Sequence, residues 1–339
     1  MDHLPIIDIS PHRRASEPAA LAREIDRACR DTGFFYVVGH GVSTALQTRV
    51  ESLAREFFAL PETEKARVAM VHGGRAWRGW FPVGGELTSG APDVKEGFYF
   101  GQELGADDPL VVAGTPLHGP NLFPDRPAGL REAVLEYIEA LTDVGHALLA
   151  SISRALDLDE RWFDRNLTAD PIVLFRIFHY PPLTLDAGAA AAAPWSVGEH
   201  TDYGLITMLW QDSAGGLEVR GRDGWVAAPP VPDAFVVNLG DMLERMTGGA
   251  YRSTAHRVRN TTGVDRISFP LFLDPAWDAE VLPIPFAHLH AVDGADDATD
   301  RWDGASVHEW SGTYGDYLLG KVGKVFPALL EEVLPTDAP

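Results

Sequence analysis

Residues 200–210 read His200-Thr201-Asp202-Tyr203-Gly204-Leu205-Ile206-Thr207-Met208-Leu209-Trp210, a histidine and a carboxylate followed by an apolar run that predicts a strand. Alternate residues of a strand point to the same side. His200 and Asp202, placed at a strand end, can therefore direct an imidazole and a carboxylate at one metal ion. Among the twelve histidines of the chain, His200 alone has an acidic residue two positions later.

A third ligand has to come from another strand, so its distance along the chain is free. His256 lies in Tyr251-Arg252-Ser253-Thr254-Ala255-His256-Arg257-Val258, which predicts such a strand. His288 and His290 form a rival pair, but neither has a carboxylate at the same spacing, and we interpret them as surface or structural residues. Two histidines and one carboxylate that leave other coordination positions open are typical of non-haem Fe(II) oxygenases.

Arg266-Ile267-Ser268 lies ten residues beyond His256 and is also expected on a strand. Arg266 and Ser268 would then face the same side, where a guanidinium can bind a carboxylate with two hydrogen bonds and a hydroxyl can add a third. A buried arginine needs an anion beside it, because an unpaired charge is costly in the interior. The pattern predicts either a site for an anionic ligand or a structural salt bridge.

The composition is that of an ordinary globular protein, with 339 residues, 45% hydrophobic and 23% charged. The net charge of −21 argues against nucleic acid and against anionic membranes as partners. The single cysteine, Cys29, excludes an internal disulfide and fits a reducing compartment. No signal peptide and no apolar run long enough to cross a membrane is seen, so we expect a cytoplasmic protein without an obligate protein partner.

The second half of the chain consists of short apolar strands separated by turns, which is typical of a sandwich or jelly roll. We expect strands at Ile172–Tyr180, Gly204–Trp210, Gly216–Val219, Trp225–Ala227, Ala234–Asn238, Ala255–Val258 and Arg266–Leu273. The predicted fold class is α+β with a mainly β core, a double-stranded β-helix flanked by helices. A small-residue insertion that includes Ala189–Ala193 precedes the first ligand, and we interpret it as a mobile loop or a tolerated insertion.

The first half is expected to pack on this core. It has strand patterns at Pro5–Ile9 and Phe34–Val38, a helix from an N-cap at Ser43 to Phe58, and its longest helical pattern at residues 127–156. Tyr314–Val325 predicts a terminal helix. Residues 1–170 thus form a helical and loop region, 171–290 the jelly roll, and 291–339 a helix and tail. We expect them to form one integrated domain.

Several motifs together resemble the Fe(II)/2-oxoglutarate-dependent dioxygenases of the isopenicillin N synthase-like superfamily, most closely its microbial branch. The resemblance covers nearly the whole chain. It is carried by Thr32–Gly41, Tyr180-Pro181-Pro182, His200-Thr201-Asp202, Val237–Asp241, Tyr251–Val258 and Arg266-Ile267-Ser268. This context, and not spacing, selects His256 as the third ligand. One position departs from many plant members, which have Asn where this chain has Phe178.

The resemblance implies that His200, Asp202 and His256 bind Fe(II), and that Arg266, Ser268 and Tyr180 bind the co-substrate 2-oxoglutarate. The enzyme would use O₂ to oxidise, most simply hydroxylate, a small molecule in secondary metabolism, releasing succinate and CO₂, with ascorbate helpful in vitro. Asn238 and Asp241 are expected either to support the metal ligands or to belong to the turn at Gly240. Residues expected to line the substrate site are Tyr203, Arg176, Phe272, Lys95, Phe98 and Trp195.

Two kinds of alternative remain. Isopenicillin N synthase and the aminocyclopropane-carboxylate oxidases have the same R-x-S motif without consuming 2-oxoglutarate, so an oxidase or cyclase of this fold is possible, as is an ethylene-forming enzyme. A jelly roll that binds a metal without catalysis is the alternative from another class. The intact triad argues against it.

Overall fold

The computed structural model describes residues 3–10, 18–182, 195–284, 301 and 303–327. The alanine-rich insertion, the His288 and His290 pair and the end of the polar tail lie outside the described residues.

The larger of two sheets has eight strands in the order β1-β2-β10-β7-β12-β5-β4-β3. These are β1 (Ile6–Asp8), β2 (Phe34–Val38), β3 (Gly79–Phe81), β4 (Glu96–Gly101), β5 (Ile172–Tyr180), β7 (Ile206–Gln211), β10 (Phe235–Leu239) and β12 (Arg266–Asp274). β1 and β2 pair in parallel, and the other neighbours pair antiparallel. Strands from the first 101 residues therefore complete the sheet on both sides of those from the second half.

The smaller sheet has four strands in the order β6-β11-β8-β9. Its members are β6 (Val197–His200), β8 (Leu217–Gly221), β9 (Gly224–Ala227) and β11 (His256–Val258). A compact apolar cluster lies between the two sheets and includes Phe34 and Val236 from the larger sheet and Val219 and Val258 from the smaller one. Two sheets packed over a shared core confirm the predicted jelly roll. β6 was not predicted, although β9 and β11, which are no longer than β6, were.

Four long helices flank this core: α2 (Pro18–Asp31), α3 (Thr44–Phe58), α6 (Leu130–Ala155) and α9 (Tyr314–Val325). Ser43 caps α3 as predicted, since its side chain accepts a hydrogen bond from the Leu46 N–H. Short helical segments are α4 (Glu62–Lys65), α5 (Pro109–Val112), α7 (Trp162–Asn166), α8 (Asp241–Met246), η1 (Ala66–Val68), η2 (Met70–Ala76) and η3 (Thr88–Gly90).

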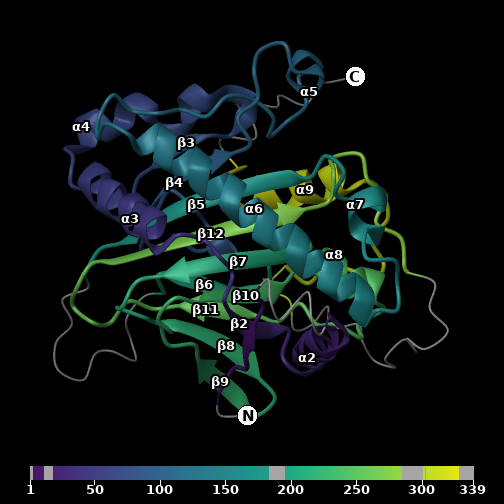
Figure 1. Ribbon diagram of the computed structural model, residues 1–339. Helices are drawn as coiled ribbons and strands as arrows, with labels where there is room; N and C mark the ends of the chain where they lie inside the picture. The colour runs from purple at the N-terminus through teal and green to yellow at the C-terminus, as the bar shows by residue number, and fades with distance from the viewer. Residues whose placement is uncertain (1–2, 11–17, 183–194, 285–300, 302, 328–339) are drawn as a thin grey trace.

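Helix α6 crosses the face of the larger sheet that points away from the smaller sheet (Figure 1). Its apolar stripe includes Tyr137, whose ring lies 5.4 Å from that of Phe175 on β5. Gly145 sits where the helix comes closest to the sheet. A Cβ atom at this position would lie 2.7 Å from Cδ2 of Leu273, so a larger residue would displace the Leu273 side chain from its present position. This packing leaves the opposite face of the sheet to the functional residues.

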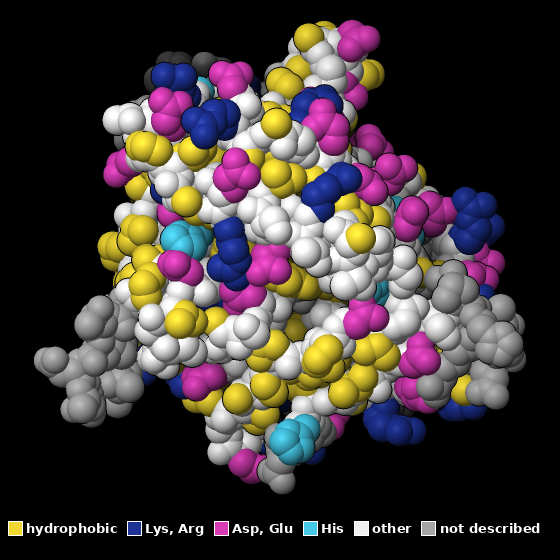
Figure 2. All heavy atoms as spheres, turned by 60° about the vertical axis from the view of Figure 1, so that its left-hand side comes forward, with side chains coloured by type: hydrophobic (Ala, Val, Ile, Leu, Met, Phe, Trp, Pro, Cys, Tyr) yellow, Lys and Arg dark blue, Asp and Glu magenta, His cyan; other side chains and the backbone are white. Residues whose placement is uncertain are grey.

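None of the helices in the described part of the chain is both long and apolar enough to cross a membrane. On the face drawn in Figure 2, Lys and Arg side chains stand among Asp and Glu side chains and form no continuous basic strip in the described part of that face. Hydrophobic side chains gather in the lower part of the same view.

Candidate metal and co-substrate site

The metal-binding candidates come together where the two sheets meet. His200 ends β6 and His256 begins β11, and the two residues are direct cross-strand partners. Oδ1 of Asp202 lies 3.8 Å from Nε2 of His200 and 3.7 Å from Nε2 of His256. Two metal–ligand bonds of about 2 Å each can join atoms at most about 4 Å apart. The three side chains therefore have the spacing to share one ion. Among the described residues, they form the group of three potential metal ligands whose ligand atoms lie close together.

Hydrogen bonds fix which ligand atom each histidine presents. Nδ1 of His200 lies 2.8 Å from the Gly198 carbonyl oxygen, and Nδ1 of His256 lies 3.3 Å from that of Thr254. Each ring therefore donates from Nδ1 and leaves Nε2 free to bind a metal. Burial, together with the nearby charge of His200, lowers the pKa of His256 to about 4. The neutral imidazole that a metal requires is thus favoured.

Asp202 is oriented in the same way. Its Oδ2 accepts hydrogen bonds from Nδ2 of Asn238 at 2.6 Å and from Oγ1 of Thr207 at 2.5 Å, which leaves Oδ1 for the metal. Burial alone would raise the pKa of Asp202, but the neighbouring histidines and these two hydrogen bonds outweigh it and lower the pKa. Asn238 was expected near a ligand. Thr207 was missed, although a polar residue at an inward position of an apolar strand was a usable signal.

Asp241 contributes through its backbone. Its N–H donates to the carbonyl oxygen of Asp202 at 2.8 Å, whereas its carboxylate points to Ser253, Tyr317 and Arg301. The Asp241 side chain therefore makes no direct hydrogen bond with Asp202, and only its backbone holds the segment that carries Asp202.

The residues predicted to bind an anion lie beside the triad on the same face of the larger sheet. Arg266 begins β12 and pairs directly with Tyr180 at the end of β5. Its guanidinium lies 4.4 Å from the centre of the Tyr180 ring, and the Tyr180 hydroxyl is 3.1 Å from that of Ser268. All three residues are buried. The sequence expectation that these side chains come together agrees with their positions.

The contacts of Arg266 leave part of its guanidinium without a partner. Nε donates to the Gly215 carbonyl at 2.5 Å and Nη2 to Oε1 of Gln211 at 3.4 Å. Nη1 has no hydrogen-bond partner among the described residues, and no acidic side chain among them pairs with Arg266. A fully buried cation without a carboxylate is costly. A dicarboxylate such as 2-oxoglutarate, with one end on the metal and the other on Arg266 and Ser268, fits this donor set.

A second arginine faces the same interior from β5. Strand residues alternate, so Arg176, Phe178 and Tyr180 share one face, and Tyr99 on β4 stands directly opposite Arg176. The central carbon of the Arg176 guanidinium lies 3.4 Å from the centre of the Tyr99 ring and 5.6 Å from the centre of the Phe272 ring. Its Nη1 is buried without a hydrogen-bond partner among the described residues. Burial and the charge of Arg176 lower the pKa of Arg78 to about 9, so a second cation adds to the positive potential here.

Asp274 lies within electrostatic range of both Arg176 and Asp202, and Tyr203 lies within range of Asp202. Asp274 is influenced by both sides: burial raises its pKa to about 7, the Asp202 carboxylate adds to the rise, and Arg176 opposes it. Tyr203 follows Asp202 directly, and burial raises its pKa with help from the Glu86, Asp241 and Asp202 charges. These positions are compatible with a substrate held between Arg176 and the metal.

Phe98 and Trp195 were predicted to line the substrate site, and both predictions are wrong. Phe98 occupies the other face of β4, where its ring lies 4.5 Å from that of Phe57. Trp195 stacks against the guanidiniums of Arg257 at 4.1 Å and Arg259 at 3.6 Å. Arg257 alternates with His256 and Val258 on β11, so Trp195 lies on the side of the smaller sheet that faces away from the triad.

Lys95 was expected in a loop over the opening, where it would line the substrate site. It lies buried just before β4, where its ammonium is 2.7 Å from Oε2 of Glu86 and also contacts Asp93. It lies 4.7 Å from the centre of the Phe178 ring. A buried lysine needs such carboxylates. Phe178 shares its face of β5 with Arg176 and Tyr180, so a role of Lys95 beside the substrate stays a prediction.

The geometry agrees with what known proteins show. Residues 4–126 match the family model described as non-haem dioxygenase in morphine synthesis N-terminal, and residues 171–275 match the 2OG-Fe(II) oxygenase superfamily. A Dictyostelium discoideum protein named an iron/ascorbate oxidoreductase is 45% identical over 98% of each chain. A Dictyostelium mucoroides 1-aminocyclopropane-1-carboxylate oxidase is 35% identical over 96% of each.

Solved structures lead to the same family. A full-length Neurospora crassa protein in complex with alpha-KG, which is 2-oxoglutarate, and thymine superposes with a TM-score of 0.77 at 25% identity. The match covers 94% of this chain and 96% of that one. Fe(II) and 2-oxoglutarate are the cofactors that this family uses, and the His-Asp-His group has the composition they require. The chain belongs to the Fe(II)/2-oxoglutarate-dependent dioxygenases.

Proposed function

We propose that the protein hydroxylates a small organic substrate with O₂ and 2-oxoglutarate, releasing succinate and CO₂. In this proposal His200, Asp202 and His256 hold the iron, and Arg266, Ser268 and Tyr180 hold the co-substrate. The observation that carries it is the buried guanidinium of Arg266, whose Nη1 has no partner among the described residues. When bound, the iron and 2-oxoglutarate together supply the oxidising power of the reaction.

The chain's own part in this reaction is to bind and orient. Asn238 and Thr207 hold Oδ2 of Asp202, so that Oδ1 stays directed at the metal. Ser268 and Tyr180 share a hydrogen bond, so either hydroxyl can turn to donate to a carboxylate next to Arg266. The buried surroundings exclude water, which strengthens each of these contacts.

We further propose that the substrate carries a carboxylate that binds Arg176, with Tyr203 and Phe272 beside it. Arg176 makes no hydrogen bond or ion pair with a described residue, and its charge adds to that of Arg78 nearby. A relative 35% identical is named an oxidase of 1-aminocyclopropane-1-carboxylate, a molecule with such a group. A carboxylate is the ligand that a planar guanidinium binds best.

The proposed co-substrate use is tested by turnover with Fe(II), ascorbate and 2-oxoglutarate across a panel of small carboxylic acids. Substrate-stimulated formation of succinate is expected. If no acid stimulates succinate and an anaerobic titration detects no 2-oxoglutarate binding, the proposal fails.

The substrate class is tested by comparing each active acid with its methyl ester. The wild-type protein should prefer the acid about ten-fold or more, as for a hydrogen bond to a charged group. The variant Arg176→Gln should lose that preference while it still binds iron and 2-oxoglutarate. An unchanged preference in the variant would remove Arg176 from the substrate site.

A second candidate function is an oxidase that does not consume 2-oxoglutarate. The 1-aminocyclopropane-1-carboxylate oxidase relative favours it, because its name gives a different use of the same fold. Product formation from a carboxylate substrate without stoichiometric succinate distinguishes this reaction from the hydroxylation. Gas released from 2-oxoglutarate alone would instead indicate an ethylene-forming enzyme.

A further inference from the structure

We propose that Arg301 is a positioning residue for the iron site, although it lies far along the chain from every ligand. It would act through Thr201, which stands between His200 and Asp202, and through helix α8. This inference rests on the proposed assignment of His200, Asp202 and His256 as iron ligands.

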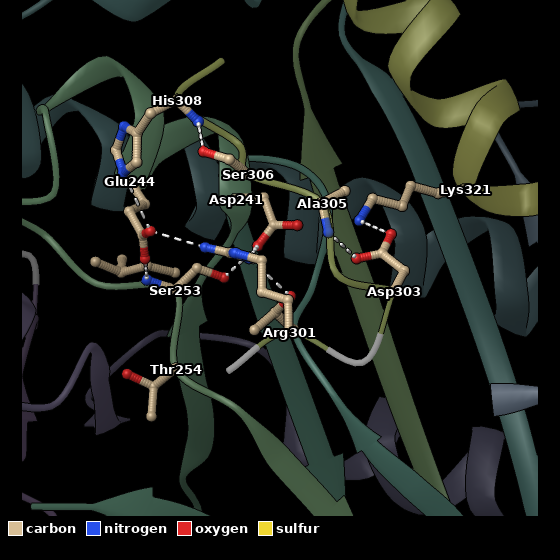
Figure 3. A network of polar contacts seen from close by, with 12 residues as sticks. Asp241, Glu244, Ser253, Thr254, Arg301, Asp303, Ala305, Ser306, His308 and Lys321 are labelled. Carbon is tan, nitrogen blue, oxygen red and sulfur yellow. Dashed lines mark hydrogen bonds and ion pairs between the residues drawn. The ribbon is translucent and has the colours of Figure 1, made fainter. Parts of the chain in front are cut away.

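Arg301 is enclosed by polar partners. Its Nη1 donates to Oδ1 of Asp241 at 2.6 Å and to Oγ1 of Thr201 at 3.2 Å, and its Nη2 donates to Oε1 of Glu244 at 2.7 Å. The arginine side chain is 2% exposed, and the two carboxylates are 0% and 5% exposed. Figure 3 shows the guanidinium directed at Asp241 and Glu244.

The two carboxylates in turn hold the segments that carry metal ligands. The Asp241 N–H donates to the carbonyl oxygen of Asp202 at 2.8 Å. Ser253 lies three residues before His256, and its hydroxyl donates to Oδ1 of Asp241 at 2.8 Å. The Ser253 N–H donates to Oε2 of Glu244 at 2.7 Å. Arg301 therefore joins the loop that holds Asp202 to the one that leads into His256.

The charge of Arg301 is what makes this junction stable. Asp241 and Glu244 lie one turn apart on α8, both buried, and without a cation they would repel each other. His308 also approaches Glu244, with Nε2 3.5 Å from Oε1, and Tyr317 donates to Oδ2 of Asp241. Neither contact replaces a guanidinium that binds both carboxylates. Loss of the cation would let the loops move, and metal ligands tolerate shifts of only about 0.5 Å.

Arg245 offers a matched control. It belongs to the same helix α8 and also ties it to later residues, since it donates to the carbonyl oxygens of Val281, Val307 and His308. No contact of Arg245 reaches the loop around Thr201 among the described residues. A variant at Arg245 should weaken the packing of helix α8 while leaving the contacts of Thr201 and Asp202 unchanged.

The test is metal binding by the metal-free full-length protein, titrated with Co(II) in air and with Fe(II) under nitrogen. We expect Arg301→Gln to weaken binding of both ions by about ten-fold or more, because losing a residue that orients metal ligands usually has an effect of this size. Arg245→Gln should change the metal affinity by less than about two-fold, because Arg245 does not orient a metal ligand. Thermal unfolding of the metal-free proteins reports the stability lost by each variant.

Unchanged affinity in Arg301→Gln, or an equal loss in both variants, would overturn the proposal. Arg301→Lys keeps the positive charge and should restore part of the affinity. If Arg301→Gln does not fold, Thr201→Val removes the direct contact alone and should weaken metal binding by itself. His200→Ala separates the two proposals: if it binds metal like the wild type, the ligand assignment has failed and not the role of Arg301.

Discussion

Arg266→Lys tests the proposed co-substrate site most directly. The lysine keeps the positive charge but loses the planar guanidinium. In the wild type, Nε of that group donates to the Gly215 carbonyl while Nη1 remains free to bind a ligand. One ammonium cannot do both, because it lacks the fixed geometry of the guanidinium. A hydrogen bond to a charged group contributes about 1.5–3 kcal/mol. Affinity for 2-oxoglutarate should therefore fall about 10- to 150-fold.

The assay is an anaerobic titration of the Fe(II) protein with 2-oxoglutarate, followed by the visible charge-transfer band. It measures binding without turnover. Ser268→Ala should have a smaller effect, about 2- to 10-fold, because a neutral hydrogen bond contributes about 0.5–1.5 kcal/mol. Steady-state kinetics should show KM for 2-oxoglutarate rising more than kcat falls.

Arg257→Lys is the matched control, because Arg257 faces away from the triad and pairs with Glu218 at 2.7 Å. It should leave the dissociation constant unchanged. The reasoning is refuted if Arg266→Lys binds iron normally and retains 2-oxoglutarate affinity within about two-fold, since the lost hydrogen bond should exceed that. An anion other than 2-oxoglutarate would then be the partner of Arg266.

Three further outcomes are expected. Asp202→Ala should abolish Fe(II) binding, measured by metal analysis after gel filtration, and retained iron would contradict the triad. Asp274→Asn should stabilise the metal-free protein more at pH 8 than at pH 5 in urea unfolding. Burial raises the pKa of Asp274 from 3.8 to about 7, so the folded state holds a proton that the unfolded state has lost, and stability falls as pH rises through that window. An equal effect at both pH values would show that Asp274 does not titrate there. Burial also raises the pKa of the Cys29 thiol, so thiol reagents should modify it only after unfolding, and rapid modification of the native protein would contradict its burial.

Much of the site could be predicted because it depends on local periodicity. His200 and Asp202 are two residues apart, as are Arg266 and Ser268, and strand alternation places each pair on one face. Their joining into one site depends on the cross-strand partners of His200 and Arg266, which are His256 and Tyr180. Only the family context supplied those partners in advance.

The wrong predictions arise because strand periodicity does not say which of the two faces of a strand points toward the site. β4 could turn either Phe98 or Tyr99 toward the site, and both residues suit a buried strand. The register decides it, because Tyr99 lies opposite Arg176 and shares its face. Trp195 was misplaced for a similar reason, since its aromatic ring suits a pocket as well as a stack on half-buried arginines.

The distribution of charge explains why the unpaired arginines are informative. The chain has 49 acidic and 28 basic residues, so a buried cation has many potential partners within the protein. Lys95 and Arg301 each contact two carboxylates. Arg266 and Arg176 contact none in the described part of the chain, although both are buried on the face that carries the triad. In a protein this acidic, buried cations without an acidic partner beside the proposed metal ligands are the places where we expect carboxylates of bound molecules to supply the missing charge.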